Sequence, residues 1–198
     1  MKKLLSIVAL CLIAILAGTI IVFSCVDKDN NINLKNPDYI EILVNKQSGV
    51  PSESYYKDDA IAERKEIYDD IIKLYNASFK QKIMSGIFQG ILFDKVEVVR
   101  NRQSLTSILS NGTFIAFNYY DDQSLSLKNK NYVYKNVTTS AESIPYKTIY
   151  VEVKNTDAMT DINIYIKNKE SENDSTYRIV VKTKQASLYN YIQENFAD

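Results

Sequence analysis

Ser54 and Lys57 have the spacing of a serine nucleophile and its base. They are three residues apart and stand just before a segment with helical periodicity. Residues three apart lie on the same face of a helix, so the Lys57 amine could accept the proton of the Ser54 hydroxyl and activate it. This chemistry would suit a hydrolase or a transferase.

The Ser-x-x-Lys pattern resembles the nucleophile motif of penicillin-binding proteins, but the motifs that accompany it in that family are missing. No Ser-Asp-Asn follows, and Lys147-Thr148-Ile149 and Lys182-Thr183-Lys184 lack the glycine of Lys-Thr-Gly. A chain with this many serines and lysines is expected to contain such a match by chance. An ordinary junction between a loop and a helix is therefore the favoured interpretation.

Three pairs of adjacent aspartates are the other groups that could perform acid–base chemistry. They are Asp58/Asp59, Asp69/Asp70 and Asp121/Asp122. Two carboxylates can hydrolyse a glycosidic bond when they face each other across it. Adjacent residues of a helix do not face each other, and Asp121-Asp122 is a turn signal. We therefore expect solvated surface acids.

Missing residue types exclude several kinds of site. The chain has no histidine, and its two cysteines, Cys11 and Cys25, lie within the first 25 residues. The usual Ser-His-Asp and Cys-His catalysis and Cys/His zinc sites are thus excluded for the remainder. Asp27 and Asp29 begin like a calcium loop, but Ile32 stands where that loop needs glycine. We predict no catalytic residue, no cofactor and no metal.

The charge balance argues against a nucleic-acid partner. Lys plus Arg and Asp plus Glu both number 24, so the formal net charge is zero. Binding to nucleic acid requires an excess of basic groups that neutralise phosphates. The five glycines also form no phosphate-binding loop.

The first 25 residues predict a membrane anchor. Two lysines precede an uncharged apolar run from Leu4 to Phe23, which is the layout of a secretory signal. As a helix the run would be roughly 30 Å long, enough to cross the hydrocarbon core of a bilayer. Because the lysines favour the cytoplasmic side, we expect the rest of the chain outside the cytoplasm.

Ser24-Cys25, at the end of this run, resembles the lipobox of bacterial lipoproteins. The resemblance implies that the Cys25 thiol carries a lipid and that the preceding signal is removed. Val22 and Ser24 fit the pattern, whereas Phe23 departs from it because a small residue is usual there. The length of the apolar run favours an uncleaved transmembrane helix instead. The sequence does not decide between the lipid anchor and the transmembrane helix. Either anchor places the rest of the chain outside the cytoplasm.

The remaining chain divides into a polar tether over residues 26–38 and one α+β domain over residues 39–198. Helical spacing of Ile61, Ile67, Ile71 and Leu74 predicts a long amphipathic helix, which Asp58 or Asp59 could cap. A short helix is expected near the C-terminus, at residues 185–196. Between them the period changes to two, as in an antiparallel sheet of about five to seven strands covered on one side. The expected strands are residues 39–44, 93–100, 113–120, 131–137, 146–154, 161–168 and 176–183.

Tyrosine is in excess, with 15 residues in the chain. A candidate binding face on the polar side of the sheet consists of Tyr132, Tyr134, Tyr146, Tyr150 and Tyr165. A tyrosine ring offers a large rigid contact with a hydroxyl at its tip, which suits peptide or glycan surfaces. The alternative explanation is the strand propensity of tyrosine together with the codon bias of an AT-rich genome.

These observations favour a non-enzymatic module at a bacterial cell surface, held at the cell membrane by its N-terminal segment. The module would bind or sense a protein or glycan partner in the cell envelope. The alternative function is a cell-envelope hydrolase or transferase that uses carboxylates or the Ser54–Lys57 pair.

Overall fold

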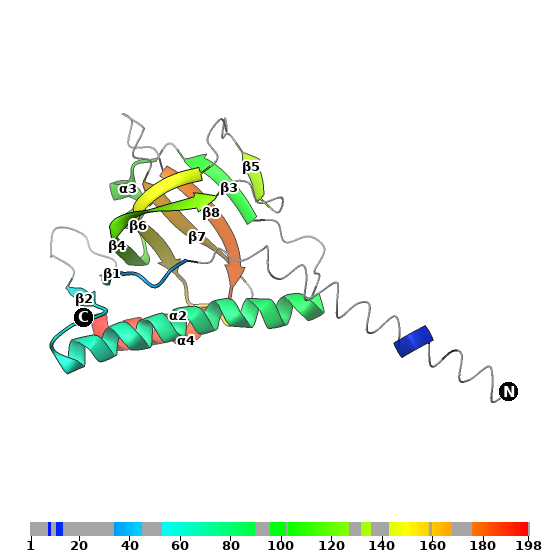
Figure 1. Ribbon diagram of the computed structural model, residues 1–198, viewed down its shortest axis with the longest axis horizontal. Coiled ribbons are helices and arrows are strands. Elements are labelled where there is room, and N and C mark those ends of the chain that lie inside the picture. The colour runs from blue at the N-terminus through cyan, green and yellow to red at the C-terminus, as the bar shows by residue number, and fades with distance from the viewer. Residues whose placement is uncertain are drawn as a thin grey trace.

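The computed structural model describes residues 8, 11–13, 34–44, 53–89, 96–101, 103–126, 132–135, 143–158, 160–167 and 176–197. One eight-stranded sheet dominates this part of the chain, and two helices pack beside it (Figure 1). The fold is therefore α+β, as predicted. The strands are β1 (Tyr39–Val44), β2 (Ser54–Tyr56), β3 (Val96–Asn101), β4 (Thr113–Ser126), β5 (Tyr132–Lys135), β6 (Ser143–Val153), β7 (Thr160–Lys167) and β8 (Thr176–Thr183). The helices are α2 (Ala62–Gln89), α3 (Leu105–Leu109) and α4 (Ala186–Phe196).

The strand order is β2-β1-β4-β6-β7-β8-β3-β5. Neighbouring strands are antiparallel except β3 and β5, which are parallel. The register aligns one buried β-branched residue from each of six strands across the sheet. This row consists of Ile42, Ile115, Val151, Ile164, Ile179 and Val98. Such cross-strand neighbours pack closely, so the alternation in the sequence is sufficient to define the core face of the sheet.

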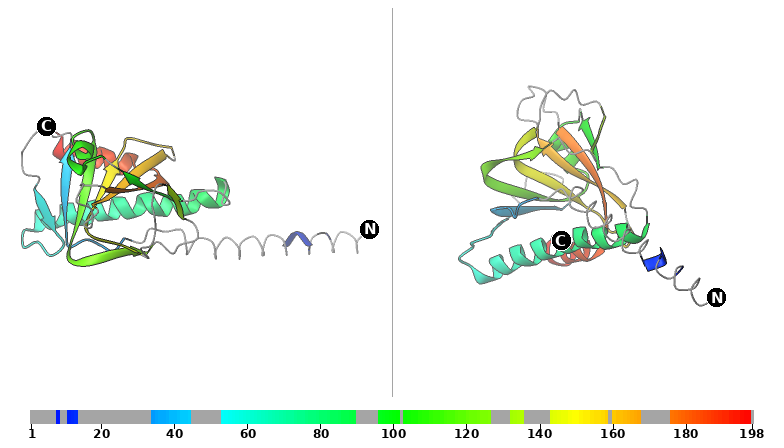
Figure 2. Two further views of the ribbon diagram at one scale, coloured as in Figure 1. Left: turned by 90° about the horizontal axis from the view of Figure 1, so that it is seen from above. Right: turned by 45° about the vertical axis from the view of Figure 1, so that its right-hand side comes forward.

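Helices α2 and α4 lie together along this apolar face (Figures 1 and 2). On α2, Tyr68, Ile71 and Tyr75 are buried, and Leu188 and Ile192 of α4 join the same core. The Asp59 carboxylate accepts the Ile61 N–H at 3.0 Å just before α2 begins. The predicted amphipathic helix and its packing on the sheet are therefore confirmed, whereas the Asp59 bond lies in the turn before the helix and not at its N-cap.

Two local predictions were wrong, and one short helix was missed. The sheet has eight strands because residues 54–56, expected as a loop, pair with β1. Helix α3 was not expected, because five residues are too few for a periodic pattern. Asp121-Asp122 is not a hairpin turn, since β4 continues to Ser126 and absorbs these residues in a register shift between Asn118 and Gln123.

Residues 34–38 belong to the folded domain, although they were expected in the tether. Leu34 packs against the core, and the Tyr119 hydroxyl donates a 2.8 Å hydrogen bond to the Lys35 carbonyl. The buried Tyr68 hydroxyl donates to the Pro37 carbonyl at 2.5 Å. These bonds fix the chain immediately before β1, so a tether can extend only to residue 33.

Most of the expected anchor, including Cys25, lies outside the described residues. Val8 and residues 11–13 are described as helical and exposed. Among the described residues, no helix has both the length and the apolar character needed to cross a bilayer.

Candidate functional site

Three tyrosines form an exposed cluster at the β2 edge of the sheet. Tyr39 of β1 pairs with Tyr56 of β2, and their rings stack with centroids 5.2 Å apart. The Tyr120 ring lies 6.0 Å from Tyr39 on its other flank. Tyr56 is 39% exposed and Tyr120 is 63% exposed. We call Tyr39, Tyr56 and Tyr120 the tyrosine cluster.

A hollow of about 290 Å³ lies beside this cluster. Its walls come from three segments that are distant in sequence: the residue before β1, the turn from β2 to α2, and the middle of β4. The lining residues are Asp38, Tyr56, Asp58, Asp59, Ala60 and Tyr120. The hollow is therefore a product of the tertiary fold, with aromatic and acidic walls.

The register shift in β4 explains why Tyr120 reaches this position. Pairing of β4 with β6 stops at Asn118 and resumes at Gln123. The intervening residues are released from the ladder, as in a bulge. The Asp38 carboxylate accepts the Tyr120 N–H at 2.7 Å and holds the released backbone against the start of β1.

The three aspartates of the hollow are engaged to different degrees. The pKa of Asp59 lies below its ordinary value because its carboxylate accepts the Ile61 N–H and also binds Arg64. Asp38 uses one carboxylate oxygen for the Tyr120 N–H. Asp58 is exposed, and its carboxylate forms no hydrogen bond or ion pair with any residue that the structure describes. Asp58 is thus the carboxylate with the most capacity for an external ligand.

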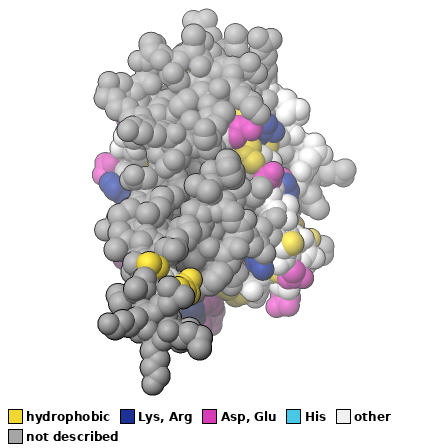
Figure 3. Space-filling model, turned by 90° about the vertical axis from the view of Figure 1, so that its right-hand side faces the viewer, with side chains coloured by type: hydrophobic (Ala, Val, Ile, Leu, Met, Phe, Trp, Pro, Cys, Tyr) yellow, Lys and Arg dark blue, Asp and Glu magenta, His cyan; other side chains and the backbone are white. Residues whose placement is uncertain are grey.

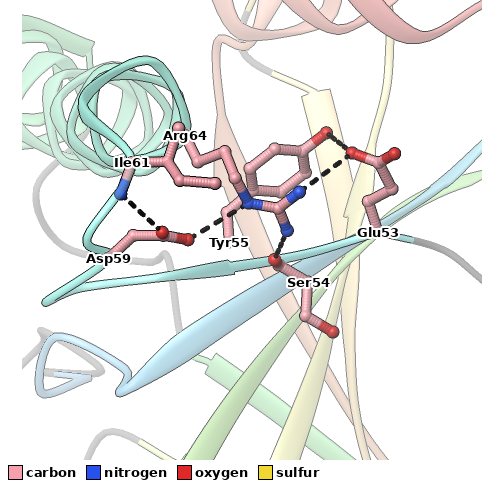
Figure 4. Close-up of polar contacts among 6 residues, drawn as sticks. All are labelled: Glu53, Ser54, Tyr55, Asp59, Ile61 and Arg64. Atoms are coloured by element: carbon pink, nitrogen blue, oxygen red, sulfur yellow. Dashed lines mark hydrogen bonds and ion pairs between the residues drawn. The ribbon is translucent and has the colours of Figure 1, made fainter.

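Arg64 closes the outer edge of β2 (Figure 4). Its Nη2 donates to the Ser54 carbonyl at 2.5 Å, its Nε donates to Asp59 at 3.2 Å, and its guanidinium carbon lies 5.3 Å from the centre of the Tyr55 ring. The Tyr56 carbonyl accepts the Asp59 N–H at 3.2 Å. Both carbonyls that β2 would offer to an added strand are therefore occupied, which protects the edge.

Replacing Arg64 with methionine is expected to lower the free energy of unfolding by about 1–2 kcal/mol, because the change removes a charged donor from a partly buried carbonyl. Urea titration of the variant measures this loss. Lys65→Met is the matched control, since Lys65 forms an exposed i,i+4 ion pair with Asp69 and its loss should cost less than about 0.5 kcal/mol. Equal losses in the two variants would contradict the role of Arg64.

The structure does not bring Ser54 and Lys57 together. Ser54 lies in β2, not in the first turn of a helix, and its hydroxyl donates to Glu41 Oε1 at 3.3 Å. Lys57 lies outside β2, in the turn that follows it, and its side chain is exposed. Of the other acid pairs, Asp69 binds Lys65 on α2 and Asp121 is exposed on β4.

Two of the five tyrosines predicted for a binding face are buried. Tyr146 is 5% exposed and its ring meets Tyr119 edge-on, with centroids 5.7 Å apart. Tyr165 is 7% exposed and packs on Phe114 beneath α3. Tyr146 and Tyr165 therefore cannot form the predicted face, because the register shift turns Tyr146 inward and α3 covers Tyr165.

Of the other three predicted tyrosines, the structure describes the side chain of one. Tyr150 is half-buried and packs against the same small cluster under α3. Tyr132 and Tyr134 lie in β5, whose side chains are outside the part that the structure describes. The tyrosine cluster at Tyr39, Tyr56 and Tyr120 was missed. The Tyr119-Tyr120 doublet was a usable signal, because adjacent strand residues face opposite sides.

On the face drawn in Figure 3, the charged side chains that the structure describes are few and scattered, in small groups of mixed sign. No group of three or more acidic, cysteine or histidine side chains among the described residues is arranged to hold a metal ion. The chain matches no family model, no curated protein and no solved structure.

Proposed function

We propose that the chain is a membrane-tethered, extracytoplasmic binding module that contacts a partner in the cell envelope through the tyrosine cluster. The observation that carries this proposal is the exposure of Tyr56 and Tyr120 beside a hollow of about 290 Å³. Tyrosine gives a large contact area with little loss of side-chain entropy. Adjacent exposed aromatic rings therefore make a suitable recognition surface, whereas isolated ones need no explanation.

The anchor supports the location of this surface. Either a transmembrane helix over residues 4–23 or a lipid on Cys25 would hold the chain in the membrane. Residues 26–33 would then connect the anchor to the domain, over at most roughly 30 Å of extended chain. Because Asp38, which lines the hollow, lies only five residues after residue 33, one wall of the hollow is close in sequence to the point where the tether would join the domain.

One labelling experiment tests both the topology and the contact surface. The variants Tyr120→Cys and Asp161→Cys introduce single cysteines into a domain that has none, at two exposed positions. A membrane-impermeant benzophenone maleimide should label both variants on intact cells, because both positions face outside. On illumination, the label at position 120 should form a cross-linked adduct and the label at position 161 should not.

The unaltered chain is the control for labelling of Cys11 and Cys25. Failure to label either variant on intact cells, with labelling restored after lysis, would overturn the extracytoplasmic topology. Labelling of both variants with no adduct, or with equal adducts, would overturn the tyrosine cluster as the contact surface.

A further inference from the structure

We infer that the hollow binds a lysine or arginine side chain presented by a partner polypeptide. This inference rests on the proposed function, and it names the chemistry of the partner. It combines the size of the hollow, its charge, its aromatic walls and the closed edge of β2.

The size of the hollow suits a single side chain. Cavities that enclose drug-sized ligands measure roughly 300–1,000 Å³, and this hollow, at about 290 Å³, lies just below that range. A lysine or arginine side chain is long and narrow, with an apolar stem and a charged tip. Such a side chain can lay its stem on a ring and place its tip among carboxylates.

The charge of the walls selects a cation. Asp38, Asp58 and Asp59 all line the hollow. Arg64 binds one of these three carboxylates, that of Asp59. Its guanidinium also contacts Glu53 and the Ser54 carbonyl. Asp58 has no such internal partner among the described residues. An anionic ligand would be repelled here, whereas a cation would supply Asp58 with a partner.

The aromatic walls favour an organic cation. Tyr56 and Tyr120 line the hollow, and the ring of Tyr39 packs against both of them. A cation over the face of a tyrosine ring gains about 0.5–1 kcal/mol at an exposed site. The aspartates are not arranged as a metal-ligand group. The negative charge of the hollow therefore favours an organic cation, which can contact the carboxylates and the tyrosine rings together.

The closed edge of β2 determines how a partner polypeptide would be recognised. Because Arg64 and the Asp59 N–H occupy the two outward carbonyls, an extended partner cannot join the sheet by strand addition at this position. Recognition must then come from side chains. A cationic side chain entering the hollow satisfies this requirement.

The test is an NMR titration of the full-length chain in non-ionic detergent micelles. The ligand is Nα-acetyl-lysine N-methylamide, and the matched reference ligand is the norleucine analogue, which lacks the ammonium group. We expect saturable shifts of the backbone amides of Tyr56, Asp58, Ala60 and Tyr120 with the lysine compound only. Shifts that are absent, that do not saturate, or that are equal for both ligands would overturn the inference.

Four exposed-site variants separate the contributions of charge and ring. Asp58→Asn and Tyr120→Ser should each weaken lysine binding about two- to fivefold, in line with the loss of one exposed cation–π or charge contact. Tyr120→Phe keeps the ring and should weaken binding less than about twofold. Asp161→Asn removes a carboxylate elsewhere and should change nothing. Equal effects of Asp58→Asn and Asp161→Asn would overturn the site.

The two experiments fail independently. A cross-linked adduct at position 120 without lysine binding would leave the binding module standing and reject a cationic partner. Lysine binding without a cross-linked adduct would reject the tyrosine cluster as the contact surface on cells. The inference that the hollow binds a cation would still stand. Failure of both would reject the tyrosine cluster as a functional surface.

Discussion

Raising the pH from about 9 to about 12 is expected to unfold the domain, because its core contains tyrosines that must stay neutral in the folded state. Burial raises the pKa of Tyr68 to about 12. The pKa values of Tyr75, Tyr119 and Tyr146 are also raised, in each case chiefly by burial. In the unfolded chain these hydroxyls ionise near their ordinary value of about 10.

The sign of the effect follows from proton binding. Above about pH 10 the unfolded chain binds fewer protons than the folded chain, so the free energy of unfolding falls as the pH rises. Each such tyrosine contributes about 1.4 kcal/mol per pH unit until its folded-state pKa is reached. Domains are stable by about 5–15 kcal/mol, so a few buried tyrosines suffice to remove that margin. The stabilisation is fully present below about pH 10.

Circular dichroism against pH, together with tyrosinate absorbance, measures this transition. The absorbance change of the core tyrosines should coincide with the circular dichroism change, because these hydroxyls ionise when the domain unfolds. Exposed tyrosines ionise without unfolding and give a separate, earlier part of the absorbance change. Tyr146→Phe removes the hydroxyl of a buried side chain that forms no hydrogen bond with the residues that the structure describes, so its alkaline midpoint should rise. Tyr120→Phe, at an exposed ring, is the matched control and should leave the midpoint unchanged.

Between about pH 6 and about pH 9 the stability should be nearly constant. The chain has no histidine, and residues 26–198 contain no cysteine, so the side chains that ordinarily titrate in this range are missing from the domain. Ionisation of all the tyrosines before the circular dichroism signal changes, or a steep loss of stability below about pH 9, would contradict the burial of these hydroxyls.

The period-two alternation was enough to predict the core face of the sheet. Ile149, Val151 and Val153 alternate with more polar residues, and all three are buried. Ile162, Ile164 and Ile166 behave in the same way on the next strand. An aliphatic side chain is stable only when it is buried. Its position in the alternation therefore shows which face of the strand points to the core.

Tyrosine is harder to place by this logic, and two residues predicted for the binding face, Tyr146 and Tyr165, are buried instead. A tyrosine ring can be buried while its hydroxyl finds a partner, or it can lie exposed with the hydroxyl in water. Tyr119 and Tyr120 are adjacent and take opposite positions, the first donating to Lys35 and the second lining the hollow. Strand alternation places Tyr119 on the core face with Ile115 and Phe117 and Tyr120 on the opposite face, but it does not show that Tyr120 lies beside Tyr39.

The hollow itself could not be predicted from the sequence. Its lining residues come from positions 38, 56–60 and 120, and the contacts between them depend on the pairing of β1 with both β2 and β4. β2 is three residues long, which is too short for an alternation to be recognised. The strand order that places Asp38 beside Tyr120 is a non-local property, because more than 80 residues separate the two along the chain.

Replacing Phe117 with alanine is expected to lower the free energy of unfolding by about 3–5 kcal/mol, the usual cost of truncating a buried phenylalanine. Phe117 is 1% exposed and pairs with Ile40 on one side and Ile149 on the other. Its ring meets Tyr75 of α2 edge-on, with centroids 4.7 Å apart. The truncation would therefore leave a cavity where the sheet and α2 meet.

Urea unfolding measures this loss, and two further variants define its origin. Phe117→Leu keeps most of the volume and should cost less than about 1.5 kcal/mol. Phe196→Ala truncates a partly exposed ring near the end of α4, beside Tyr55, and should cost clearly less than Phe117→Ala. A Phe117→Ala variant as stable as Phe196→Ala would mean that α2 does not pack on this face. The hollow would then also lose its support, since the turn that carries Asp58 and Asp59 is positioned by the start of that helix.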